Sequence, residues 1–197
     1  MYKLVSILIL TTVYQSFVLS DSSLPSVCPD IISKKRWDAR TALEVDYVII
    51  PIDNVVVHHT VTSSCDYEDD CASLLRNIQN FHMEELEFHD IGYNFMVGGD
   101  GRIYEGAGWH KVGAHTRGYN TRSLGLAFIG NFTTQLPSKK QLQCAKDFLK
   151  CGVVLGELSK EYKLFAARQV SSTASPGLKL YRELQNWPHF TSRPPPK

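Results

Sequence analysis

Residues 55–60 read VVVHHT, an apolar run that ends in two histidines and a threonine. Three β-branched residues in succession favour a buried strand. Neighbouring side chains of a strand point to opposite faces, so only one of His58 and His59 should point at any given site. At a strand end the pleat often decays, however, and both can then reach one groove. The alternative is one structural and one exposed histidine.

Around this strand, strand-like and helix-like segments interleave. The strand patterns are Asp46–Ile50, Asn54–Thr60, Phe95–Gly98, Arg102–Tyr104 and Leu124–Ile129, the third and fourth being joined as a hairpin by a Gly-rich turn. The helix patterns cover Cys71–Leu86, Ser138–Leu158 with Ser138 as N-cap, and a last segment from Ser175-Pro176 to about Asn186, with Pro176 in its first turn. This order predicts one α/β domain with a central sheet and flanking helices.

The first 20 residues, MYKLVSILILTTVYQSFVLS, combine an early lysine, a short apolar core and a small residue at the end. This pattern is typical of a secretory signal peptide, so we expect residues 1–20 to be removed. No later segment has the roughly 18 consecutive apolar residues of a membrane span. Basic and acidic residues balance in the remainder, which gives no case for a nucleic-acid partner.

The five cysteines all follow the predicted signal peptide, and secretion favours disulfides. Cys65 and Cys71 bracket the turn-like loop CDYEDDC and are expected to pair. Cys144 and Cys151 are about 10 Å apart if they share a helix, too far for a bridge. Cys28 should therefore pair with one of these two, and an odd cysteine remains. Asn131 begins an Asn-Phe-Thr sequon, which is a glycosylation acceptor in a secreted protein.

Several polar and aromatic residues lie near turns or element ends, where sites are usually built. The candidates beyond the first two histidines are His82, Tyr93, Trp109, His110, His115 and Asn120. Each also has a simpler interpretation: His82 as a helix-surface side chain, and Tyr93 and Trp109 as core packing. Their clustering is suggestive, whereas no single one is decisive.

Five stretches taken together resemble the peptidoglycan recognition proteins, and more narrowly a short, secreted insect member of the SA type. They are VVVHHT, FHMEELEFHDIGYNFMVGGDGRIYEGAGW, GAHTRGYN, LGLAFIGNF and SPGLKLYRELQNWPHF. The resemblance runs from about residue 36 to residue 190. It implies the fold of N-acetylmuramoyl-L-alanine amidases, a mixed central β-sheet with three main helices and an open groove. It also implies disulfides Cys28–Cys151 and Cys65–Cys71, with Cys144 unpaired.

Catalytic members of this family hold zinc with two histidines and one cysteine, assisted by a tyrosine. His58 and Tyr93 match the first histidine and the tyrosine. The segment AARQVSSTASPG at 166–177 places Ala167 in the second histidine position and Ser175 in the cysteine position. Alanine has no donor atom, and a neutral serine hydroxyl is a poor zinc ligand beside a thiolate. We therefore expect no metal, no cofactor and no zinc amidase activity.

Ligand-contacting positions of the family are matched by His59, Thr60, His82, Tyr93, His115 and Asn120, and His58, Trp109 and Ser175 are expected to line the same groove. Neutral polar groups and aromatic faces suit sugars and short peptides. Three further positions concern the peptidoglycan type. Phe88 agrees with lysine-type binders, Ala107 cannot pair with the extra carboxylate of diaminopimelate, and Glu87 should favour an ammonium and repel a carboxylate. The resemblance therefore implies a preference for lysine-type peptidoglycan.

The leading hypothesis is a non-catalytic receptor in the haemolymph that binds bacterial peptidoglycan and signals through other recognition proteins and serine proteases to Toll or melanisation. An alternative is a stem-peptide hydrolase with Ser175 as nucleophile and His58 as base. The simpler interpretation is that Ser175 caps the last helix. A third hypothesis is a scavenger that binds without signalling. The expected parts are a signal peptide at 1–20, a disulfide-tied segment at 21–35, the recognition domain at 36–190 and a loose tail at 191–197.

Overall fold

A computed structural model describes residues 28–197, and the predicted signal peptide lies outside this range. The domain is built on one six-stranded sheet of order β1-β4-β3-β5-β2-β6. All neighbouring strands run parallel except β3 and β4, which form an antiparallel hairpin, so the sheet is mixed as expected. The strands are β1 (Ile31–Ile32), β2 (Ile52–His59), β3 (Phe95–Val97), β4 (Ile103–Glu105), β5 (Leu124–Phe128) and β6 (Leu158–Ala166).

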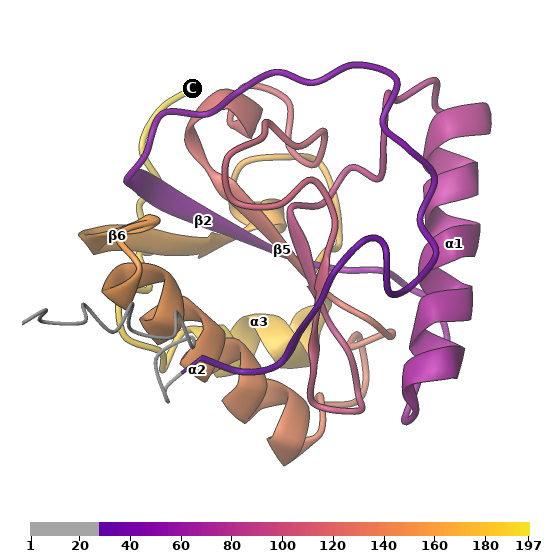
Figure 1. The fold of residues 1–197 in the computed structure, drawn as a ribbon. Coiled ribbons are helices and arrows are strands. Elements are labelled where there is room, and N and C mark those ends of the chain that lie inside the picture. The colour runs from indigo at the N-terminus through magenta and orange to yellow at the C-terminus, as the bar shows by residue number, and fades with distance from the viewer. Residues whose placement is uncertain (1–27) are drawn as a thin grey trace, which may run out of the picture.

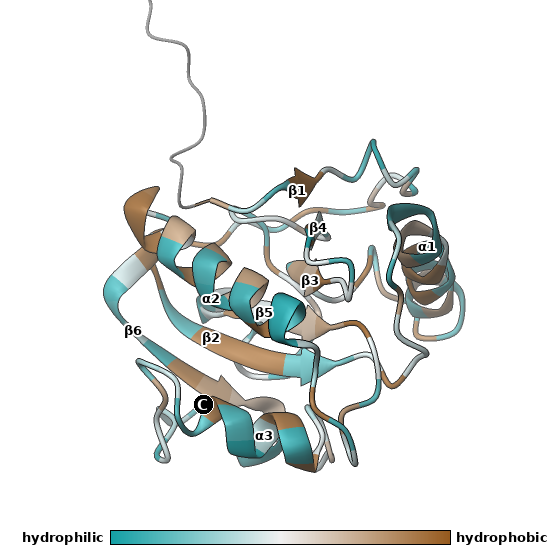
Figure 2. Ribbon diagram, turned by 90° about the horizontal axis from the view of Figure 1, so that it is seen from below, coloured by the Kyte–Doolittle hydropathy of each residue, from teal (hydrophilic) through white to brown (hydrophobic). Residues whose placement is uncertain are grey.

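The three main helices cover both faces of the sheet (Figure 1). Helix α1 (Glu68–Glu84) stands apart from α2 (Lys139–Val154) and α3 (Leu178–Leu184), which lie together on the other side. Two short 3-10 helices, Asn120–Arg122 and Ala167–Gln169, complete the elements. In Figure 2, β2 is strongly apolar while α2 shows an outer polar stripe, as expected for a buried strand and an amphipathic helix.

The pleat of β2 divides its side chains between two cores. Val55 and Val57 pack in a large cluster with Phe128 of β5, Phe148 of α2 and residues of α3. Val56 belongs to a separate cluster on the opposite face, with Phe165 and Ala167. The alternation continues to the strand end, so His58 lies on the face of Val56 and His59 on the face of Val57.

Local signals explain how α2 is placed. The Ser138 hydroxyl accepts a hydrogen bond from the Gln141 amide and caps the helix, as the sequence predicted. The buried side chain of Gln141 then donates to the carbonyls of Val97 and Ile129, at the ends of β3 and β5. These bonds satisfy strand-end carbonyls and fix the start of the helix over the sheet.

Several sequence-based expectations about elements are wrong. Helix α3 begins at Leu178, so Pro176 precedes it rather than lying in its first turn. Residues 46–50 form only one isolated bridge, between Tyr47 and Lys111, and the chain bends at Ile50, so they are not a strand of the sheet. The helix expected to reach Leu158 ends at Val154, because Gly156 adopts φ +76 and turns the chain into β6. Strand β6, along the edge of β2, was not predicted at all.

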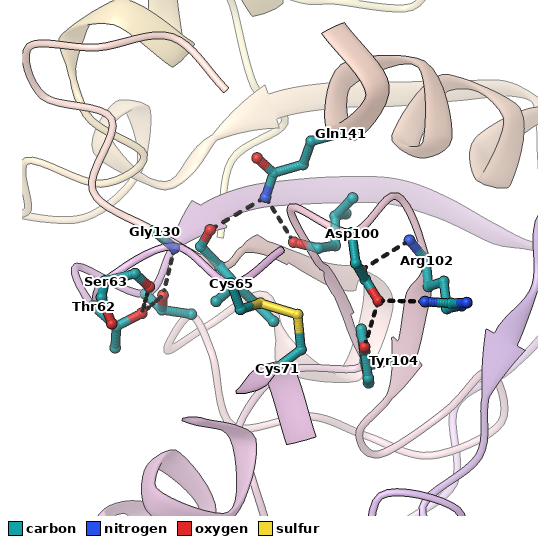
Figure 3. Close-up of a disulfide and its surroundings, with 12 residues drawn as sticks. Thr62, Ser63, Cys65, Cys71, Asp100, Arg102, Tyr104, Gly130 and Gln141 are labelled. Atoms are coloured by element: carbon teal, nitrogen blue, oxygen red, sulfur yellow. Dashed lines mark hydrogen bonds and ion pairs between the residues drawn. A yellow bond between two sulfur atoms is a disulfide. The ribbon is translucent and has the colours of Figure 1, made fainter. Parts of the chain in front are cut away.

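The disulfides agree with the pairing that the resemblance implied. Cys28 is bonded to Cys151 of α2, and Cys65 is bonded to Cys71 of α1. Cys144 is free and buried. Figure 3 shows the second bridge beside the hairpin residues Asp100, Arg102 and Tyr104, where the Tyr104 hydroxyl donates to Asp100.

The C-terminal segment, expected to be loose, is seated on the domain. Thr191 donates its amide to the carbonyl of Leu164. The Tyr119 hydroxyl donates to the carbonyl of Pro195 at 2.6 Å, and Arg122 donates to the carbonyl of Pro196. A proline tract has no amide donors but keeps its carbonyls free to accept, which suits this contact. Within residues 28–197, no helix has the length and apolar character needed to cross a membrane.

Candidate ligand-binding site

A row of five rings lies on the α1 side of the sheet, and we call it the ring row. Its neighbouring ring centroids are 5.4–5.6 Å apart: His115 to His58, His58 to Tyr93, Tyr93 to His82, and His82 to Phe88. The rings come from β2, from α1 and the loop that follows it, and from the loop of His115 between β4 and β5. The fold thus brings together five of the residues that the sequence singled out.

A threonine that the sequence-based site omitted joins the two histidines at one end of the row. The Thr116 hydroxyl lies 3.0 Å from His58 Nε2 and 3.0 Å from His115 Nδ1. A hydroxyl has one proton, so it donates to one ring and accepts from the other. Both rings can therefore share this hydroxyl while neutral, although the Nε2 atom of His115 is buried without a hydrogen-bond partner among the described residues. Asn120 holds the loop by accepting the Thr116 amide at 2.7 Å.

Burial keeps the histidines of the ring row uncharged. It lowers the pKa of His58 well below its usual value, assisted by the neighbouring His115 and His59. Burial also lowers the pKa of His115 to about 4 and that of His82 to about 4, the latter against an opposing effect of Asp90. The pKa of Tyr93 rises to about 12 for the same reason. At neutral pH the row is therefore polar but uncharged, and His58 and His82 are buried within it.

His82 is not the helix-surface side chain of the simpler interpretation. It is buried near the end of α1, and its Nδ1 accepts the Gly92 amide at 2.9 Å. This bond places the ring proton on Nε2 and fixes the ring between Tyr93 and Phe88. The position of Gly92 in turn depends on close packing, since a Cβ atom there would meet the Ala114 carbonyl oxygen at 2.9 Å.

The three positions that the resemblance matches to zinc ligands, His58, Ala167 and Ser175, lie near one another, but their donor set does not fit the metal. Val57 pairs with Ala166 across β2 and β6, which sets Ala167 beside His58. Ala167 is buried in the cluster of Val56 and Phe165 and offers no donor atom. The Ser175 hydroxyl is occupied as acceptor from the His59 amide at 3.1 Å. One histidine and one neutral hydroxyl are too few ligands for zinc.

The capping role proposed for Ser175 is wrong, because α3 begins at Leu178 with Gly177 as its N-cap. The hydroxyl instead ties the loop to the end of β2. Among the described residues, no hydrogen bond joins Ser175 to His58, whose Nε2 is bonded to Thr116. The serine hydrolase alternative therefore lacks the nucleophile-to-base contact that it requires.

Three expected groove residues lie apart from the ring row. The His59 ring lies on the opposite face, where its Nδ1 accepts the Phe132 amide at 3.2 Å. Thr60 accepts the Gly130 amide and shares its hydroxyl with Thr62. Trp109 stacks on Phe148 of α2 at 4.7 Å, so the core-packing interpretation is correct for it and the groove assignment is wrong.

A cavity of about 240 Å³ includes two of the residues linked to ligand choice, Ala107 and Asn120. Its lining includes three acidic residues, Glu44, Asp46 and Asp90, and one lysine, Lys111, and the carboxylate of Asp90 is already ion-paired with Lys34. Glu87 and Phe88 are outside this lining. Glu87 is exposed and has φ +56, a left-handed conformation in which glycine and asparagine are the favoured residues.

Two residues that support the site were missed. Asn94 is fully buried, and its side chain donates to the carbonyls of Gly108 and Lys111 while accepting the Gly125 amide. Gly125 lies under the His115 ring, where a Cβ atom would approach the ring within 2.4 Å. Thr116 is part of the motif GAHTRGYN, but no local pattern reveals its contact with His58 of β2. Nor does a local pattern reveal that a glycine is needed at position 125 beneath the His115 ring.

This mixed sheet with three helices, and the ring row beside β2, define a protein of the amidase fold. The family model described as N-acetylmuramoyl-L-alanine amidase matches residues 50–178. Peptidoglycan-recognition protein 1 of Holotrichia diomphalia is 52% identical over 181 residues, which cover 92% of each chain.

Two solved structures are similarly close. Drosophila peptidoglycan recognition protein SA has 53% identity and a TM-score of 0.83, over 85% of this chain and 96% of its own. Peptidoglycan recognition protein LE, solved with tracheal cytotoxin, a monomeric diaminopimelic acid-type peptidoglycan, has 44% identity and a TM-score of 0.81, over 82% and 95%. The chain belongs to the peptidoglycan recognition proteins, within the amidase family.

Proposed function

We propose that this protein is a secreted receptor that binds lysine-type bacterial peptidoglycan without zinc amidase activity. The observation that supports the proposal is an ordered ring row beside two positions, Ala167 and Ser175, that offer no zinc ligand. His58, Tyr93 and Thr116 form a neutral, ordered and largely buried group, whereas Ala167 is apolar and the Ser175 hydroxyl is engaged by the His59 amide. Such a site can hold sugars and peptides but has no group to activate water.

The lysine-type preference is supported by the cavity beside Ala107. Glu44 and Asp46 in its lining favour an ammonium group and oppose a second carboxylate on the ligand, whereas Asp90 is already paired with Lys34. Ala107 itself supplies no cation. The structure of the related LE protein contains a diaminopimelic acid-type ligand, so the two chains offer a direct comparison.

The deciding experiment measures binding of lysine-type and diaminopimelate-type muropeptides of equal length by calorimetry, followed by mass spectrometry of the ligands. We expect at least several-fold tighter binding of the lysine type and no cleavage. Tighter binding of the diaminopimelate type would overturn the specificity. Product that disappears with EDTA would overturn the zinc argument, and EDTA-resistant product lost in Ser175→Ala would favour the serine hydrolase instead.

A matched pair of variants tests the cavity. Asp46→Asn removes a carboxylate from its lining and should narrow the preference for the lysine type. Asp53→Asn removes an exposed carboxylate outside it and should leave the preference unchanged. Equal effects of the two changes would show that the cavity does not read the ligand's charge.

Export and signalling belong to the same proposal. The predicted signal peptide, the two disulfides and the Asn131 sequon are consistent with extracellular residence in haemolymph. The downstream step is an extracellular protease cascade that ends at Toll or melanisation. Haemolymph depleted of this protein should lose protease activation by lysine-type peptidoglycan and regain it when purified protein is added. A depleted sample that responds normally would support the scavenger hypothesis.

A further inference from the structure

The segment from Leu43 to Ile50 carries the densest group of exposed apolar side chains in the described chain. Its members are Leu43, 69% exposed, Val45, 40%, Tyr47, 76%, Ile49, 88%, and Ile50, 45%. In Figure 1 this indigo segment runs along the outside of the domain before it enters β2. Five large apolar residues within eight positions form a patch of the kind that monomeric proteins rarely leave uncovered.

The backbone of this segment is paired on one side only. The Val48 amide donates to the His110 carbonyl, and the Val112 amide donates to the Asp46 carbonyl. In this pattern the amide and carbonyl of Tyr47, between the two bonded residues, point away from Lys111. Within residues 28–197, the backbone groups of Val45, Tyr47 and Ile49 make no hydrogen bond. The segment is thus an open edge with apolar side chains at alternate positions.

We propose that this edge pairs with the same edge of a second copy of the chain, in an antiparallel arrangement about a two-fold axis at Tyr47. The outward-facing residues are 45, 47 and 49, so the register that matches Tyr47 with its own copy is the one that uses all three. Val45 of each copy then lies opposite Ile49 of the other copy. Any shift of register loses at least one pair.

The acidic residues of the segment are compatible with this register. Asp46 falls opposite Val48 of the second copy, and Glu44 falls opposite Ile50, so no carboxylate faces a carboxylate directly. Glu44 also lies 3.2 Å from His89 of its own chain. Apolar cross-strand pairs and backbone bonds therefore form without a direct like-charge contact. The edge ends at Pro51, which has no amide to continue the ladder.

The first test is the mass of the purified full-length secreted protein as a function of concentration, by sedimentation equilibrium. We expect a reversible shift from one chain toward two between low and high micromolar concentration. Tyr47→Lys should weaken dimerisation at least tenfold, because it places two ammonium groups at the axis. Leu178→Lys changes a residue of α3 that is also exposed and should have no effect. A single-chain mass for the unchanged protein throughout would overturn the proposal.

The second test reads the register by thiol cross-linking. Tyr47→Cys puts two thiols opposite each other at the axis, in a hydrogen-bonded pair whose Cβ atoms are too far apart for an unstrained disulfide, and a short bis-maleimide should yield a covalent dimer. Ile49→Cys exposes a thiol at a more accessible position, but it lies opposite Val45 and should cross-link far more slowly. Equal trapping of the two variants would overturn the register and the edge-to-edge arrangement with it. Each variant's thermal unfolding serves as the control for correct folding.

Discussion

Val61, the residue after Thr60, has φ +59 and is 61% exposed. A β-branched side chain in the left-handed region is strained by roughly 1–2 kcal/mol, whereas asparagine tolerates it. Val61→Asn should therefore raise the free energy of unfolding by about 1 kcal/mol, measured by urea denaturation. Val154→Asn is the matched control, since Val154 is 60% exposed but belongs to α2. A gain no larger than in the control would contradict the strain argument.

The buried histidines make stability depend on pH. Burial lowers the pKa of His82 to about 4, while an unfolded chain has a histidine pKa near 6.5. The unfolded state therefore binds more protons between these values, so this contribution is complete above pH 6.5 and is lost as the pH falls toward 4. Urea denaturation at pH 7 and pH 5 should show a clear loss of stability at pH 5, and His82→Gln should reduce that loss. Equal stability of the wild type at both pH values would be inconsistent with neutral burial.

At the scale of elements, Gly156 separates α2 from β6. It has φ +76, and an added Cβ atom would meet nothing within 4 Å. The cost of Gly156→Ala is then purely a backbone cost of about 1 kcal/mol, and Gly156→Asn should cost less. Chemical denaturation of the two variants measures the difference. A larger loss for asparagine would show that side-chain contacts, rather than the left-handed backbone, decide the outcome.

How much of the fold could be predicted differs from element to element. The run VVVHHT and the N-cap Ser138 are local signals, and β2 and the start of α2 were correctly predicted from them. Residues 46–50 alternate like a strand, but they lie at the surface, and their pattern does not reveal that only Lys111 is available as a bridge partner. Strand β6 was hidden because Leu158 also continued the helical pattern beyond Gly156.

For the site, sequence reasoning found side chains but not their directions. The rings of His58, Tyr93 and His82 pack together as expected, whereas Trp109 packs in the hydrophobic core against Phe148 of α2. A tryptophan in a glycine-rich loop could line a groove or pack in the core. Only the contact of Trp109 with Phe148 decides between these two interpretations. The role of Thr116 depends on a contact between residues 58 positions apart, which no spacing in the sequence encodes.

At the scale of the whole molecule, the two disulfides close loops of very different length. Cys28–Cys151 spans 123 positions, and Cys65–Cys71 spans 6. Loop-closure entropy predicts a stabilisation of about 5 kcal/mol for the first and about 2 kcal/mol for the second. Replacing each pair by alanine and measuring chemical denaturation should reproduce this order. A greater loss for the short loop would mean that local packing around Cys71, rather than chain entropy, dominates.

The seated C-terminus has a practical consequence for handling the protein. Pro195 and Pro196 accept hydrogen bonds from Tyr119 and Arg122, which flank Asn120, the residue that holds Thr116 in place. An affinity tag appended to Lys197, or immobilisation of the protein through that end on a sensor chip, would pull on the loop behind the ring row. Attachment through a lysine of the outer, polar stripe of α2 would leave this loop untouched, and apparent affinities from the two formats should differ for that reason alone.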